Sequence, residues 1–195
     1  GVTDQFDLEP NTPANAPAAI IAFRLYQRFH QEEDLEWGNR ILNWNIMNLT
    51  DPVTGIVWDG LNRQGDGKID YGWNYTYNQG VVIGALVELY RIKQSQDCLK
   101  LAVKIAKEGK DDCGLFKGIF VRYLFDLLEL DPSLEEFKDM ILKNAECIME
   151  NGMNENGLIG GNWKEKEESC VDLAQHLSGI MMLETAAKLF QPIAK

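Results

Sequence analysis

Hydrophobic residues recur along this chain in two helical patterns. In the first pattern nearly every position is apolar, as in residues 80–90 (GVVIGALVELY), where only Glu88 is charged. A helix that is apolar on every side must be surrounded by other elements, because a surface helix keeps a polar face. In the second pattern apolar residues share one side and charged residues the other, as in residues 35–49. The two patterns predict buried inner helices and half-exposed outer helices.

The two patterns alternate in sequence order. Inner helices are predicted at residues 16–30, 78–92, 116–130 and 171–190, and outer helices at about 35–49, 97–108 and 132–149. Asn15 is the expected cap of the first helix, with Pro17 in its first turn. The repeat of inner helix, tight turn, outer helix and long connection predicts an all-α fold that forms part of an α/α toroid.

About seven helices are predicted, which is too few to close a twelve-helix ring. With about 28 residues for each helix and its loop, a complete ring needs about 140 residues more than this chain has. We therefore expect residues 1–195 to form a single domain that is the C-terminal portion of a larger toroid domain, with the remaining helices upstream.

The long connections and the starts of the inner helices are expected to share one face of the toroid. Functional residues concentrate on such loops above a rigid scaffold, and a 25-residue connection such as residues 50–74 is long for a compact domain. The second inner helix starts with more polar side chains than capping requires, namely Tyr77, Asn78 and Gln79. The candidate site residues on this face are Trp58, Asp59, Tyr77, Asn78, Gln79 and Lys117. Trp73 and Tyr75 add two rings that are suited to stacking.

Composition narrows the class of ligand. The net charge of −11 argues against nucleic acid, whose binding depends on Lys and Arg that neutralise phosphates.

There is no apolar run of about 20 residues to span a bilayer and no signal peptide in this chain. Four cysteines without CxxC spacing and only two histidines argue against a structural zinc site, and we expect no cofactor or metal. Unpaired cysteines favour a cytoplasmic location, with a Cys113–Cys170 disulfide as the alternative.

Two segments resemble functional sites of other proteins without meeting their requirements. Residues 62–70 (NRQGDGKID) are similar to the start of a calcium-binding EF-hand loop, but the twelfth position is Trp73 where a bidentate Glu is needed. Asp111 and Asp112 form the one Asp-Asp pair, and their neighbourhood is typical of a solvated loop pair. Neither segment is therefore taken as a functional site.

Four motifs together carry a resemblance to a known family. These are NTPANAP (residues 11–17), GIVWDG (55–60), YTYNQGVVIGALVELY (75–90) and FKGIFVRYL (116–124). In this order and spacing they resemble glycoside hydrolase family 76, the endo-α-1,6-mannanase-like enzymes. The segment AQHLSGIMMLETAAKL (174–189) is similar to the closing helix of that family.

The resemblance implies an (α/α)6 barrel that hydrolyses α-1,6-mannosidic linkages with retention of configuration. In the family, two adjacent aspartates at a Trp- and Asn-rich helix start act as nucleophile and acid, and this sequence does not contain that motif. We therefore expect no catalytic residue in this chain and no activity of the chain alone. The resemblance also implies that Asp59 holds sugar hydroxyls, so a mannan-like carbohydrate is the expected partner.

Two other function classes remain open at this point. The first is a non-catalytic carbohydrate-binding or scaffold module of the same fold, which a parent protein no longer than this chain would favour. The second is another α/α toroid enzyme, such as a sugar epimerase or an unsaturated glucuronyl hydrolase. Those enzymes rely on histidines or on acids placed differently, and this chain offers only His30 and His176.

Overall fold

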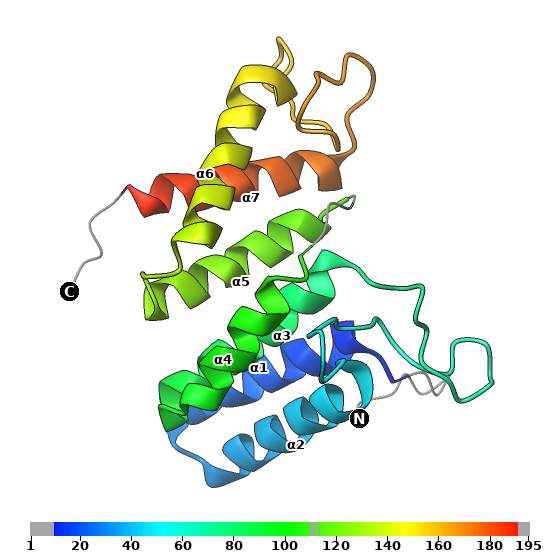
Figure 1. Cartoon of the computed structure of the whole chain (residues 1–195), viewed down its shortest axis with the longest axis vertical. Coiled ribbons are helices and arrows are strands. Elements are labelled where there is room, and N and C mark those ends of the chain that lie inside the picture. The colour runs from blue at the N-terminus through cyan, green and yellow to red at the C-terminus, as the bar shows by residue number, and fades with distance from the viewer. Residues whose placement is uncertain (1–9, 110–111, 113, 191–195) are drawn as a thin grey trace. The chain divides into compact units, whose positions relative to one another are not determined.

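The computed structural model describes residues 10–109, 112 and 114–190 (Figure 1). Asp111 and Cys113, which entered the sequence predictions, lie outside the described residues. The described part contains seven α-helices and one π-helical turn: α1 Thr12–Phe29, α2 Glu32–Leu49, α3 Thr76–Lys93, α4 Gln96–Ala106, α5 Phe116–Leu130, α6 Glu135–Cys147, η1 Ile148–Gly152 and α7 Leu173–Leu189. Its only β structure is a few isolated bridges. The predicted all-α class is confirmed.

The chain forms two compact units, residues 1–110 and 111–195. In the first unit α1 packs against both α2 and α3, and α3 packs against α4 (Figure 1). In the second unit α5 packs against α6 and α7, and α6 against α7. Among the described helices, none combines the length and the apolar character needed to cross a membrane.

Helix α3 is the buried inner helix that its sequence predicts. From Thr76 to Leu89 every residue except Tyr77 is buried. Glu88 is only 2% exposed and accepts hydrogen bonds from Arg24 (2.7 Å) and Gln27 (2.9 Å) of α1. Burial raises the pKa of Glu88, but the hydrogen bonds from Gln27 and Arg24 outweigh it, so the net pKa is below the ordinary value. The one buried charge of α3 therefore joins α3 to α1.

Helix α1 starts four residues earlier than predicted. Its cap is Asn11, whose Oδ1 accepts from the backbone N–H of Ala14 (2.9 Å). Asn15, the predicted cap, lies inside the helix with its side chain fully buried and donates to the carbonyl of Asn11 (2.7 Å). Pro17 is therefore an internal helix residue rather than a first-turn residue.

The outer helices keep a solvent-exposed face. In α2, however, the buried stripe is not the one that carries the large apolar residues Trp37 and Met47. The buried positions of α2 are Gly38, Leu42, Asn45 and Leu49. Trp37 and Met47 are 48% and 82% exposed. Gly38 lies where an added Cβ would come within 2.5 Å of the Phe23 ring, so the close packing of α2 on α1 requires a glycine there.

Helix α7 differs from the prediction of burial on all sides. In the second unit it approaches α5 closely at Gly118, whose N–H donates to the hydroxyl of Ser178 (2.9 Å). The opposite side of α7 exposes Leu173, Leu177 and Ile180. In the first unit α1 likewise exposes Ile21, Leu25 and Phe29. Two of the four predicted inner helices thus carry exposed apolar stripes.

Candidate functional site

Backbone hydrogen bonds tie the middle of the long loop between α2 and α3 to the end of α2 and to the start of α1. The N–H of Trp58 donates to Leu49 O (2.9 Å), and the N–H of Thr12 donates to Asp59 O (2.7 Å). Isolated β-bridges join Thr50 to Val57 and Asn11 to Gly60. The GIVWDG segment is therefore held against the start of α1.

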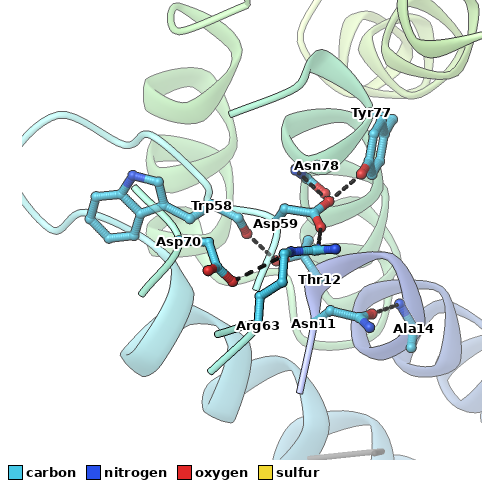
Figure 2. Close-up of polar contacts among 9 residues, drawn as sticks. All are labelled: Asn11, Thr12, Ala14, Trp58, Asp59, Arg63, Asp70, Tyr77 and Asn78. Atoms are coloured by element: carbon cyan, nitrogen blue, oxygen red, sulfur yellow. Dashed lines mark hydrogen bonds and ion pairs between the residues drawn. The ribbon is translucent and has the colours of Figure 1, made fainter. Parts of the chain in front are cut away.

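Asp59 is the centre of the polar cluster that this loop forms (Figure 2). Its side chain is buried, and three donors converge on it. The hydroxyl of Tyr77 and the amide Nδ2 of Asn78 (3.3 Å) donate to one oxygen, and the guanidinium of Arg63 (2.6 Å) donates to the other. The structure thus brings Asp59, Tyr77 and Asn78 together, as the sequence predicts, and adds Arg63.

The protonation of Tyr77 follows from this arrangement. Burial, and then the hydrogen bond to the Asp59 carboxylate, raise the pKa of the Tyr77 phenol well above its ordinary value. Tyr77 therefore stays a neutral donor to Asp59. Since Asp59 already accepts from three groups, its carboxylate holds Tyr77 and Arg63 in place.

Gln79 and Trp58 extend the cluster in different directions. Gln79 is 1% exposed, and its Nε2 donates to Asn74 Oδ1 (2.9 Å) and Val57 O (3.3 Å). Trp58 contributes its carbonyl, which accepts from the Thr12 hydroxyl (2.6 Å), while its ring points away from Asp59 (Figure 2). That ring packs edge to face against Tyr71, with 5.0 Å between the centroids.

Lys117, the remaining candidate, belongs to the second unit. Its Nζ donates to Gly161 O (3.0 Å) and lies 4.0 Å from the centroid of the Trp163 ring. Trp163 is buried, at 5% exposure. Within its own unit, Lys117 therefore fastens the connection between η1 and α7 to the start of α5.

Arg63 is the site residue that sequence reasoning did not select. Its guanidinium lies 2.6 Å from Asp59, 3.8 Å from Asp70 and 4.1 Å from the centroid of the Trp73 ring. Tyr75 meets Trp73 edge to face (5.8 Å) and stacks on Tyr77 (5.6 Å). Trp73, Tyr75 and Tyr77 thus form a continuous run of rings beside the polar cluster.

The turn at residues 62–70 is closed by its own side chains. Asn62 Oδ1 accepts from the N–H of Gly67 (2.7 Å), and Asp66 Oδ1 accepts from the N–H of Lys68 (3.1 Å). Across the described residues, no group of three His, Cys, Asp or Glu side chains is placed to hold a metal ion.

Comparisons with known proteins give a family match and several close structural matches. The family model that matches is glycosyl hydrolase family 76, over residues 7–111. The Lin0763 protein of Listeria innocua is 40% identical, with a TM-score of 0.88, and the match covers 93% of this chain and 56% of that one. An inactive variant of the alpha-1,6-mannanase of Salegentibacter sp. HEL1_6, in complex with alpha-1,6-mannotetrose, is 38% identical, with a TM-score of 0.85. That match covers 93% of this chain and 60% of the mannanase.

A more distant structure has the same fold. It is the family 76 mannosidase Bt3792 of Bacteroides thetaiotaomicron, at 18% identity and a TM-score of 0.80, with 97% of this chain and 56% of that one covered. The chain spans less than two thirds of the length of each of these three structures. The search of curated proteins found no match to this sequence.

Proposed function

Because this chain belongs to glycosyl hydrolase family 76, whose members are (α/α)6 barrels, we propose that the protein hydrolyses α-1,6-linked mannosides. The observation that carries this proposal is the 38% identity, over 93% of the chain, to an alpha-1,6-mannanase that binds alpha-1,6-mannotetrose. The polar cluster around Asp59, with its adjoining run of rings, supports it. Carbohydrate sites combine a few fixed polar groups with apolar or aromatic surface.

The substrate-binding set that we propose consists of Trp58, Asp59, Tyr77, Asn78, Gln79 and Lys117. In this set Asp59 acts mainly by fixing its neighbours, because its oxygens are occupied by Tyr77, Asn78 and Arg63. Preorganised donors lose little entropy when a sugar binds, which favours affinity. The start of α3 and the loop before it thus hold the preorganised members of the proposed set.

The chemistry that we propose is retaining hydrolysis by two carboxyl groups about 5 to 5.5 Å apart, one as nucleophile and one as acid. We place this pair in two adjacent aspartates outside residues 1–195. Support comes from the Salegentibacter mannanase, whose variants with two consecutive aspartates replaced are described as inactive.

We further propose that residues 1–195 are the C-terminal portion of one larger catalytic domain. The similar structures contain additional chain, since the match covers only 56% and 60% of their lengths. The exposed apolar stripes of α1 (Ile21, Leu25) and α7 (Leu173, Leu177) are suited to packing against further helices.

The test is an activity assay of the protein expressed from its complete gene and of residues 1–195 alone. The complete protein is expected to release mannooligosaccharides from α-1,6-mannan, and residues 1–195 alone are expected to be inactive. In the complete protein, Asp111→Asn together with Asp112→Asn should leave turnover within a few-fold. Loss of a catalytic carboxylate would remove about 10²-fold or more. An inactive complete protein, or an active 195-residue chain that the two Asn changes abolish, would overturn the proposal.

A further inference from the structure

Trp73 is an exposed ring whose position is fixed on several sides. It ends the long loop with 43% of its surface exposed. Its carbonyl accepts from the N–H of Asp59 (2.9 Å), and its own N–H donates to Asp70 O (2.9 Å). Two backbone bonds therefore fix the place from which the indole projects.

Arg63 fixes the ring itself. The guanidinium lies over one face of Trp73, at 4.1 Å from the centroid, which is a close cation–π distance. The same guanidinium is bound by Asp59 (2.6 Å), whose side chain is 5% exposed, and by Asp70 (3.8 Å), whose side chain is 10% exposed. Because a guanidinium is planar and has several donors, it can hydrogen-bond to Asp59, form an ion pair with Asp70 and lie on a ring at once. Arg63 thus connects the buried acids to the exposed indole.

A second Arg–Trp pair shows which part of this arrangement is unusual. On α2, Trp37 is 48% exposed and Arg40 lies 4.7 Å from its ring centroid. Arg40 makes no ion pair with any residue that the structure describes, whereas Arg63 pairs with two acids. Exposure and a cation–π contact are therefore common to both pairs, and only Trp73 is anchored beside a buried polar cluster.

We propose that Trp73 is a platform on which a pyranose ring of the substrate stacks, and that Arg63 is the positioning residue that holds it. This inference rests on the proposed function and adds two residues to its site. A large aromatic side chain contributes contact area at a low cost in conformational entropy, more so when it is already held in place. The C–H face of a sugar packs well on such a ring, and Tyr75 and Tyr77 continue the aromatic surface toward Asp59.

The experiment measures the affinity for alpha-1,6-mannotetraose by calorimetry, with tryptophan fluorescence as a second readout. It uses the protein from the complete gene with the two proposed catalytic aspartates replaced by Asn, so that the sugar is not cleaved, and this protein serves as the wild type for the variants that follow. Trp73→Ala should weaken binding about 10-fold, since one aromatic stacking contact is worth about that much. Trp73→Phe keeps a ring and should bind within about 3-fold of the wild type. The sugar-dependent change in tryptophan emission should nevertheless be clearly smaller in Trp73→Phe. Trp37→Ala is the matched control and should bind like the wild type.

Arg63 has its own prediction because it acts through the indole. Arg63→Met should weaken binding several-fold and reduce the sugar-dependent change in tryptophan emission, because the ring is no longer held. A merely structural role would change the unfolding temperature without changing that emission response in the folded protein.

The outcomes separate this inference from the proposed function. A wild-type protein that does not bind the tetrasaccharide contradicts the proposed function. A wild-type protein that binds, with Trp73→Ala binding equally well, overturns only the platform. The same conclusion follows if Trp37→Ala weakens binding as much as Trp73→Ala. If Trp73→Ala does not fold, Trp73→Phe decides, because an unchanged emission response would overturn the platform.

Discussion

Replacing Asp59 by Asn removes one charge from the polar cluster and keeps its shape. In the wild type one oxygen accepts from Tyr77 and Asn78, and the other accepts from Arg63. Asparagine puts an NH₂ group where one of these oxygens was. That group must then face either the guanidinium of Arg63 or the Nδ2 of Asn78, donor against donor. We therefore expect the Asp59→Asn change to loosen the loop from the start of α3.

The expected size of the effect follows from the contacts. A hydrogen bond to a charged group contributes about 1.5 to 3 kcal/mol, and at least one is lost outright. The Arg63 side chain is 34% exposed, so solvent screening reduces its share. The free energy of unfolding should fall by about 3 kcal/mol. In a protein of about 200 residues that lowers the unfolding temperature by about 6 to 12 °C, and in a larger protein the shift is smaller.

The assay is thermal unfolding followed by circular dichroism at pH 7, on the protein from the complete gene. Asp66→Asn is the control, because Asp66 is an exposed carboxylate in the same loop whose ion pair is with Lys68 (3.4 Å). A surface pair of this kind contributes little, and Asn keeps an oxygen that can accept from the N–H of Lys68, so the unfolding temperature of the control should change little. Equal unfolding temperatures for Asp59→Asn and the wild type would refute the role of Asp59 as the anchor of the cluster.

Two further predictions concern the packing of the first unit. Glu88→Gln should destabilise the protein at pH 7, and the difference from the wild type in urea unfolding should shrink as the pH falls. The reason is that the pKa of Glu88 is lower in the folded protein than its ordinary value of 4.5. The resulting stability is present above pH 4.5 and is lost as the pH falls through the folded pKa. A difference in unfolding free energy that does not depend on pH would contradict this. Gly38→Ala should lower the unfolding temperature, since its Cβ would meet the Phe23 ring at 2.5 Å, whereas Gly72→Ala, in open space, should change it little. Equal effects of the two glycine changes would show that the contact relaxes freely.

Most of the fold was predictable because burial leaves a direct mark on helical sequence. The apolar run in α3 predicts a helix buried on every side, and the structure confirms it. The start of α1 was less predictable because Asn-X-Pro occurs twice, at Asn11 and at Asn15. The loop settles the choice, since the N–H of Thr12 bonds to Asp59 O. A contact across 47 positions leaves no local signal.

The candidate site was likewise predictable only where its residues are neighbours in the sequence. Tyr77, Asn78 and Gln79 are consecutive in the sequence. They supply more polar side chains than a helix start needs for capping, and this was visible from the sequence alone. Arg63 was not visible, because its contacts with Asp59, Asp70 and Trp73 exist only after the loop folds back on itself. Likewise, an apolar pattern in α7 predicts burial but does not say which chain segment covers it. Leu173 therefore reads as core in the sequence and is 70% exposed in the structure.

The most direct test of the central claim is the stereochemistry of the first product. The protein from the complete gene is incubated with alpha-1,6-mannotetraose, and the anomeric proton of the released sugar is followed by NMR during the first minutes. A retaining family 76 enzyme should release the α-anomer before mutarotation. Initial release of the β-anomer would contradict the retaining mechanism, and absence of any cleavage of the α-1,6 linkage would contradict the proposed function.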